Sequence, residues 1–281
     1  MDYNAELAHQ NEQLQNEIEK LRAERKRVKS VRVKLSILLL VLLILSMITT
    51  TFAWFTISSI SSVDKMEITI GTGVQLLISD ENHGSDMSLY TNKVTNEDID
   101  KQLSAFNTSL EDMILDPLTT SNGVDLYTQS GVKRTANNES FLEFDLFFIS
   151  SEDMWVHLTS NESETGADNG TKISTASTGI QADIINCARI SFTDETANRT
   201  VIYEPNKSTA VGGQTTFDLP TPMALSNNTR LFQLTAQTPK KITVRIWLEG
   251  EDPQCDNDVQ RANLQVQLNF EGTDETNTPL N

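Results

Sequence analysis

The sequence predicts a mainly β protein: an antiparallel β-sandwich outside the membrane, preceded by one transmembrane helix and an N-terminal coiled-coil helix. Residues 35–57 contain no charged side chain, as is typical of a membrane span. Before them a seven-residue leucine pattern indicates a coiled coil, and after residue 64 short segments alternate apolar and polar residues as strands do. We therefore expect three parts, residues 1–34, 35–57 and 58–281.

Residues 1–34 contain neither Gly nor Pro and are expected to form one cytoplasmic helix. Leu7, Leu14 and Leu21 recur every seven residues, and Asn11 lies at the second seam position of the pattern. A buried Asn at this position favours a parallel dimer in register. The pattern thus predicts a homo-oligomer; a solvated helix that continues the membrane span is the alternative.

The segment 35–57 reads LSILLLVLLILSMITTTFAWFTI, which is long enough to cross a bilayer as one helix. Six basic residues lie in 25–34, and the next basic residue after the segment is Lys65. The positive-inside rule therefore places the N-terminus in the cytoplasm and the C-terminal domain outside the cell. A buried core helix is the alternative interpretation.

The end of this segment also has the features of a signal-peptidase site. Thr51 and Ala53 are the small residues that such a site requires, and cleavage after Ala53 would release a secreted domain beginning at Trp54. The 34 preceding residues are long for the leader of a signal peptide, which favours retention as a membrane anchor. Both outcomes are open at this point.

Charge is distributed unevenly along the chain, whose formal net charge is −17. Residues 1–34 hold eight of the 22 Lys and Arg and six of the 39 Asp and Glu, which leaves 14 basic and 33 acidic residues in the outer part. A domain with this excess of negative charge repels nucleic acid. We expect a membrane partner, through the single pass, and no nucleic-acid partner.

The outer domain is expected to begin with a strand in residues 64–79. Met66, Ile68 and Ile70 alternate with polar residues there, and Gly71 and Gly73 are expected to bend the strand before it continues. A short helix is predicted over 96–106, with Ile99, Leu103 and Phe106 on its apolar face.

Strong strand patterns resume at residue 140. Residues 140–150 and 154–158 are expected to form a hairpin, with His157 on its outer face, and residues 161–178 a mobile polar loop. Residues 188–192 and 201–203 are expected to pair across a turn.

Two further strands complete the predicted sandwich. In residues 241–249 the apolar positions 242, 244, 246 and 248 are expected to face the core, with Thr243, Arg245 and Trp247 facing outward. Residues 263–271 repeat the same alternation. Many short alternating strands separated by turns predict an antiparallel sandwich.

Two stretches resemble a known family. The run TTTFAWFT, which leads into a first strand ending at Gly71-x-Gly73, and the later VRIWLEGEDPQC resemble the TasA/camelysin-like surface proteins of Gram-positive bacteria. The resemblance implies a jelly-roll-like sandwich directly behind a special signal segment. It also implies, for some members, extracellular fibres in which each subunit lends its N-terminal strand to the next. The N-terminal coiled coil departs from this pattern.

The two cysteines, Cys187 and Cys255, both lie on the predicted outer side. An even number of cysteines outside the cell permits one disulfide between them. Cys187 lies in the apolar run IINCARISF, so the alternative is that it is simply a small core residue.

One cluster of carboxylates could hold a cation. Five acidic residues fall within ten positions after the strand 241–249, and hard cations such as Ca²⁺ take six to eight oxygen ligands. The spacing does not match an EF-hand, and a solvated acidic loop is the alternative. The candidate calcium ligands are Glu249, Glu251, Asp252, Asp256 and Asp258.

Sequence motifs for catalysis were not found. Beyond the membrane segment the chain has only His83 and His157, and it contains no GxSxG, HExxH or CxxC. Some members of the resembled family have been called metalloproteases, but no zinc-ligand spacing supports that activity here. We expect a non-enzymatic structural protein of an extracellular matrix, fibre or envelope layer, without a cofactor other than the candidate calcium. The alternative is a single-pass binding or sensory module that dimerises through its coiled coil.

Overall fold

The computed structural model describes Lys20 and residues 62–70, 76–137, 140–159, 170–204, 215, 217–218, 225–259 and 261–280. Lys20 is helical, but the rest of the predicted coiled coil, the membrane segment 35–57 and the cleavage site after Ala53 lie outside the described residues. Among the residues described, no helix is both long enough and apolar enough to cross a membrane. Residues 57–281 form one compact unit.

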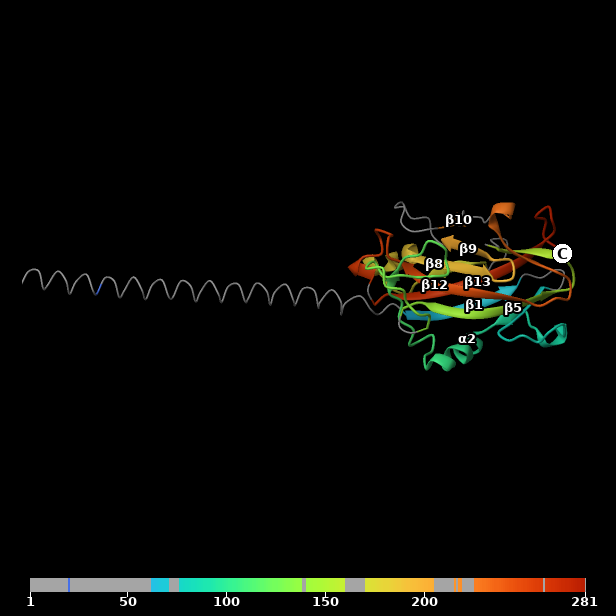
Figure 1. The fold of residues 1–281 in the computed structure, drawn as a ribbon, viewed down its shortest axis with the longest axis horizontal. Helices are drawn as coiled ribbons and strands as arrows, with labels where there is room; N and C mark the ends of the chain where they lie inside the picture. The colour runs from blue at the N-terminus through green and yellow to red at the C-terminus, as the bar shows by residue number, and fades with distance from the viewer. Residues whose placement is uncertain are drawn as a thin grey trace, which may run out of the picture. The chain divides into compact units, whose positions relative to one another are not determined.

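Two β-sheets make up this unit (Figure 1). The first, here called the β13 sheet, has the order β11-β6-β13-β1-β3, with β7 also paired to β13. Its strands are β1 (Ser62–Ile70), β3 (Lys93–Val94), β6 (Met154–Leu158), β7 (Lys172–Ser174), β11 (Arg230–Leu234) and β13 (Asn263–Thr273).

The second, here called the β12 sheet, has the order β10-β9-β8-β12-β5-β2, with β4 also paired to β12. Its strands are β2 (Leu76–Ser79), β4 (Pro117–Leu118), β5 (Leu142–Ser150), β8 (Ala188–Asp194), β9 (Arg199–Glu204), β10 (Phe217–Asp218) and β12 (Lys240–Glu249). The helices are short: η1 (Met87–Leu89), α2 (Asn96–Leu103), η2 (Ser104–Phe106), η3 (Gly179–Asp183), α3 (Ile184–Cys187), η4 (Asn227–Thr229) and η5 (Asn257–Val259).

The sheets pack face to face around one hydrophobic core. The ring of Phe148 on β5 lies 4.8 Å from that of Phe232 on β11 and 5.0 Å from that of Phe270 on β13, measured between centroids. These contacts join the two sheets, and tilted or edge-to-face pairs of this kind add to the stability gained by burial. The alternation predicted for β1, β5, β12 and β13 is confirmed, because their core-facing residues are buried.

Most strand pairs are antiparallel, but the first and last strands are not. β1 runs parallel to β13 from the pair Ser62↔Asn263 to the pair Ile70↔Phe270, and the short strands β4 and β10 also pair in parallel. The expectation of antiparallel pairing is therefore confirmed for most strand pairs but not for these. Parallel strands need a long connection, and the whole chain between β1 and β13 provides it.

Two predicted strand connections are wrong. The single bent strand expected in 64–79 is two strands in different sheets, since β1 pairs with β13 and β2 pairs with β5. The hairpin expected in 140–158 is also absent: β5 lies in the β12 sheet, whereas β6 pairs with β11 and β13. In both cases the chain crosses between sheets, so that each strand presents its apolar face to the same core from opposite sides.

The outer face of β12 is covered rather than solvated. Thr243, Arg245 and Trp247, expected to face outward, are all buried. A second hydrophobic cluster lies on this face, where Leu118 and Leu126 of the covering segment 115–137 pack with Phe141, Ile202 and Trp247.

Two smaller predictions need correction. The helix expected over 96–106 is an α-helix only to Leu103; Ile99 and Leu103 are buried, but Phe106 is 55% exposed, because the chain tightens into the 3-10 turn η2 and the apolar face no longer continues. The polar loop expected over 161–178 contains the strand β7, which pairs with β13.

Helix α2 satisfies backbone groups at the margins of both sheets. Gln102 donates to the carbonyl of Asp145 on β5 (2.8 Å) and accepts from its N–H (2.9 Å), while the side chain of Asn96 accepts from the N–H of Met66 on β1 (3.0 Å). Figure 1 shows α2 beside β5 and β1. Unpaired strand edges invite association with other chains, and α2 covers part of two such edges.

Candidate functional site

The residues predicted to bind calcium divide into two groups. The side chains of Glu249 and Asp252 are buried, whereas Glu251, Asp256 and Asp258 are exposed. The chain after β12 turns tightly here, since the N–H of Cys255 donates to the carbonyl of Asp252 (2.8 Å). The turn thus aims its carboxylates in different directions.

Asp252 belongs to a buried ion-pair cluster centred on Arg189 of β8, which is only 1% exposed. Nη2 of Arg189 donates to Oδ2 of Asp252 (2.9 Å) and lies 3.2 Å from Oε1 of Glu204 on β9. Nη1 donates to the carbonyls of Asn186 (2.8 Å) and Ala188 (2.9 Å). Charge-assisted bonds of this geometry are among the stronger polar contacts in proteins, and here they join β8, β9 and the turn after β12.

Glu249 is held by donors of its own segment. Nε1 of Trp247 donates to Oε2 of Glu249 (3.2 Å), and the N–H of Glu251 donates to Oε1 (3.1 Å). Burial raises the pKa of the Glu249 carboxyl above its ordinary value, against the opposing effect of these donors.

The structure does not gather the five acidic residues around one point. Glu249 and Asp252 are each engaged by donors of the protein, and the other three are on the surface. Within the ranges that the structure describes, no group of three or more His, Cys, Asp or Glu side chains has the arrangement of a metal site.

The two cysteines are brought together by the same turn. Cys187 ends α3 and is buried, Cys255 lies half-buried in the turn after β12, and both are free thiols. Sγ of Cys187 donates to the carbonyl of Asp183 (3.5 Å), and the neighbouring thiol of Cys255, together with burial, raises the pKa of Cys187 well above its ordinary value. Residues 68 positions apart thus meet beside the Arg189 cluster.

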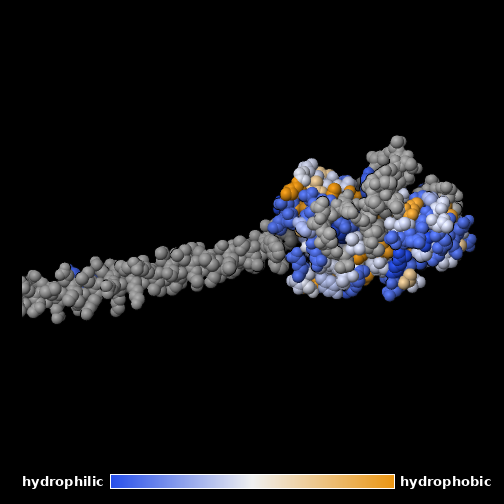
Figure 2. All heavy atoms as spheres, turned by 90° about the horizontal axis from the view of Figure 1, so that it is seen from above, coloured by the Kyte–Doolittle hydropathy of each residue, from blue (hydrophilic) through white to orange (hydrophobic). Residues whose placement is uncertain are grey.

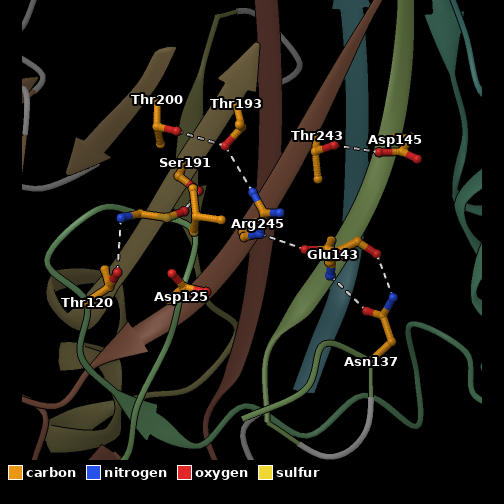
Figure 3. A network of polar contacts seen from close by, with 12 residues as sticks. Thr120, Asp125, Asn137, Glu143, Asp145, Ser191, Thr193, Thr200, Thr243 and Arg245 are labelled. Atoms are coloured by element: carbon orange, nitrogen blue, oxygen red, sulfur yellow. Dashed lines mark hydrogen bonds and ion pairs between the residues drawn. The ribbon is translucent and has the colours of Figure 1, made fainter. Parts of the chain in front are cut away.

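A second polar network lies under the segment that covers the β12 sheet (Figure 3). Arg245 is at its centre: Nε lies 2.6 Å from Oε2 of Glu143 on β5, and Nη1 donates to the hydroxyl of Thr193 on β8 (2.9 Å). Asn137 holds the backbone of Glu143 with two hydrogen bonds, of 2.7 and 2.8 Å. The network therefore ties three neighbouring strands and the end of the covering segment together.

His157 is fully buried, which corrects the expectation that it faces solvent. It does point away from the core, but Thr229 and Thr273 enclose it, with 3.3 Å from Nδ1 to the Thr229 hydroxyl and 3.0 Å from Nε2 to the Thr273 hydroxyl. Burial, and then the positive charge of Arg230, lower its pKa to about 4, so the ring is neutral at physiological pH.

The other histidine of the outer unit, His83, lies near the end of β2. Its Nε2 is 3.1 Å from the hydroxyl of Ser79, which also accepts from the N–H of Glu81 (3.2 Å). These contacts span two and four residues, so Ser79 serves to shape a local turn.

Sequence reasoning missed the residues that organise these clusters, Arg189 and Arg245. Both are charged residues at alternate positions of otherwise apolar strands, in CARISF and ITVRIWL. A buried charge requires a partner, so this pattern was the available signal that another segment covers the outer face. The sequence analysis also did not predict that Arg230 stacks on Trp155, where the guanidinium carbon lies 4.5 Å from the ring centroid.

The arrangement suits mutual neutralisation rather than the exchange of protons or ligands with solvent. Every buried Arg, Asp and Glu side chain among the described residues has a polar partner inside the unit: Arg189 and Asp252 pair, Asp194 pairs with Lys240, Arg230 with Glu275, Arg245 with Glu143, and Glu249 with Trp247. Comparison of the chain with protein-family models, with curated proteins and with solved structures finds no match.

Proposed function

We propose that this chain is a non-enzymatic structural protein of the cell surface, anchored by a single membrane pass or secreted after cleavage. It contributes to an extracellular matrix, fibre or envelope layer. The observation that carries the proposal is the use of its buried charges. Most of them join strands or turns to one another, as in the Arg189–Asp252 and Arg245–Glu143 pairs. Such ties favour one rigid arrangement of the strands, a property that a load-bearing or assembling subunit needs.

The sequence supplies the location. The charge-free segment 35–57, with basic residues before it, supports an N-terminus in the cytoplasm and an outer domain beyond the membrane. The resemblance to TasA/camelysin-like proteins supports a jelly-roll-like sandwich and assembly by strand exchange. The coloured part of the face in Figure 2 is mainly hydrophilic, and among the residues that the structure describes the large exposed hydrophobic side chains are few: Leu89, Phe106, Val132 and Ile180. Such a surface is compatible with an extracellular location.

A single-pass binding or sensory module is the second candidate. The heptad pattern of Leu7, Leu14 and Leu21 favours it, because a cytoplasmic coiled coil has no use in a subunit that is cleaved from its anchor. In this case binding of a ligand or partner outside the cell would change the dimerisation of the coiled coil inside it.

Locating the mature N-terminus of the full chain on its own cells tests the proposal. Secretion predicts a chain that starts at Trp54, and Ala53→Leu, which places a bulky residue at the cleaved position, should then keep the protein in the membrane. Thr50→Leu, outside the small-residue pair, is the matched control and should be processed normally.

The two structural outcomes and the sensory outcome differ in what accompanies the N-terminus. A protein in sedimentable extracellular assemblies supports the structural proposal, whether it starts at Trp54 or at Met1. An intact Met1 with only dimers, and no assembly outside the cell, favours the sensory module. Protection of residues 62–280 from protease added to intact cells would contradict both.

A further inference from the structure

The meeting of Cys187 and Cys255 is unlike the other contacts of the turn after β12. The other ties described there are ionic or hydrogen-bonded, as between Arg189 and Asp252. The thiol pair alone can react further, since two adjacent thiols become a covalent link on loss of two electrons and two protons.

We propose that Cys187 and Cys255 form a redox-controlled clasp, in which oxidation joins the end of α3 covalently to the connection between β12 and β13. Two observations carry it: the Arg189–Asp252 pair joins the strand that follows α3 to the turn that bears Cys255, and both cysteines pack in the same hydrophobic core, where the Cys255 thiol is close enough to perturb that of Cys187. Both segments are held in place independently of the sulfurs, so we expect closure to need little movement of the backbone. The clasp does not rest on the function proposed above, because the contact exists wherever the domain resides.

The independent ties fix both partners. On one side Arg189, two residues after Cys187, donates to the carbonyl of Asn186 and thereby holds the end of α3. On the other side Asp252 receives the same guanidinium, and its carbonyl accepts from the N–H of Cys255. One buried cation thus sets the position of both cysteines.

The difference in solvent exposure between the two cysteines sets the order in which their thiols react. Cys255 is half-buried and Cys187 is buried, so an external disulfide meets the thiolate of Cys255 first. Its sulfur attacks one sulfur of the oxidant, which leaves a mixed disulfide and releases one thiol. Cys187, after losing its proton to water, then attacks the sulfur of Cys255 and releases the second thiol. One oxidant disulfide is reduced to two thiols, and the protein gains one disulfide.

The clasp closes at the end of the unit where β1 enters its sheet. Asn263, the first residue of β13, pairs with Ser62, the first residue of β1. The same Asn263 is held by the hydroxyls of Thr175 and Ser177, in the chain segment that leads to α3. A bond between α3 and the β12–β13 connection therefore reinforces the contacts around the start of β1.

Titration of thiols in the full chain tests the clasp. We expect the reduced native protein, equilibrated with a mixture of oxidised and reduced glutathione, to lose both titratable thiols without forming covalent dimers. Its melting temperature should rise by several degrees, because the bridge closes a long loop, and should return on reduction. Amide exchange should slow in residues 250–259 and stay unchanged in the turn 195–198 at the other end of β8.

Matched variants separate the bridge from a general effect of the oxidant. Cys255→Ser should leave one thiol that reacts slowly until urea is added, whereas Cys187→Ser should leave one that reacts readily and forms a mixed disulfide with glutathione. Neither variant should change its melting temperature on oxidation by more than a degree or so. Circular dichroism of each variant establishes that it is folded.

Three results would overturn the proposal: two thiols that persist in the native protein at equilibrium with an oxidising mixture, covalent dimers in place of an internal bridge, or a bridge that lowers the melting temperature. The first two would mean that the sulfurs cannot reach bonding geometry, and the third that they reach it only by distorting the turn.

Discussion

At the scale of single residues, buried charge dominates this domain. Arg189 and Arg245 lie on the outer face of the β12 sheet, yet both are buried, since the chain covers that face. Desolvation of a guanidinium costs several kcal/mol, and only well-placed partners offset it. The loss of one partner is therefore expected to cost more than the pair itself contributes.

We predict that Asp252→Ala lowers the free energy of unfolding by about 3–5 kcal/mol, because it leaves the Arg189 guanidinium buried with one carboxylate fewer. The exposed pair of Lys133 and Asp125 provides the control: the Lys133 side chain is 60% exposed, and Lys133→Ala should cost about 1 kcal/mol or less. Urea denaturation measures both. Equal effects would mean that Asp252 is not part of a desolvated cluster.

His157 should make the domain less stable in mild acid. Its folded pKa, about 4, is below the ordinary 6.5, so the unfolded chain binds the proton more readily between these values. Its contribution is thus fully present above pH 6.5, declines as the pH falls and is lost near pH 4. The shift corresponds to at most about 3 kcal/mol.

Other groups that face His157 require a difference measurement. Arg230 lies on β11, Glu275 follows β13, and Glu271 is the cross-strand neighbour on β13. Burial raises the pKa of Glu271, so its contribution runs the other way and is lost as the pH rises through that raised pKa. We expect His157→Gln to have a flatter stability profile than the unaltered protein between pH 6.5 and 4. If the stability of the variant and that of the unaltered protein changed equally over this pH range, the burial of a neutral His157 would be contradicted.

At the scale of elements, strand β12 shows how far a pattern can lead. The alternation in 241–249 correctly predicts which residues face the core, because burial of one face requires period two. It does not show that the other face is exposed, since a segment more than 100 residues earlier in the chain covers it. Only the charged Arg245 and the bulky Trp247, on that second face, signalled a nearby partner.

The candidate calcium ligands show a related limit of local sequence patterns. The five carboxylates from Glu249 to Asp258 look equivalent as a run of letters, but the turn buries two of them and exposes three. The partner of Asp252, Arg189, is placed by the register of β8 against β12, which a local pattern does not contain. The contact between Cys187 and Cys255 depends on the same register, so the sequence could offer it only as one alternative.

The covered face changes what a pair of substitutions in β12 should do. Ile246→Asp places an unpaired carboxylate in the core and should cost several kcal/mol. If β12 faced solvent, Arg245→Asp would be mild; in this fold it places a second carboxylate beside Glu143 in a buried site and should be comparably severe. Melting temperatures measure both, with Lys241→Ala, an exposed position of the same strand, as the mild control. A mild Arg245→Asp would mean that the covering segment does not seal this face.

At the scale of the whole molecule, the order of strands makes the outer unit depend on its first segment. β1 is the only strand that the described chain places between β13 and β3, and it brings Met66, Ile68 and Ile70 into the core. The unit that contains it begins at Ile57, the last residue of the predicted membrane segment. The predicted membrane segment and the first core strand are thus close together in the sequence.

The dependence on β1 leads to a prediction with two fragments. A fragment of residues 57–281 should fold, because it retains every strand of both sheets. A fragment of residues 75–281 lacks β1. Its absence exposes the edge of β13 and removes three buried side chains, each of which contributes roughly 1.5–3 kcal/mol to stability. That loss is comparable with the whole stability of a typical domain, about 5–15 kcal/mol, so the shorter fragment should unfold or aggregate. Far-UV circular dichroism and sedimentation distinguish these outcomes.

A peptide of residues 57–75 added in trans should restore the fold, and the same peptide with Ile68→Asp, which puts a carboxylate in the core, should not. A shorter fragment that melts cooperatively at the temperature of the longer one would show that β1 is an accessory strand, and that the first strand of this protein contributes little to its core.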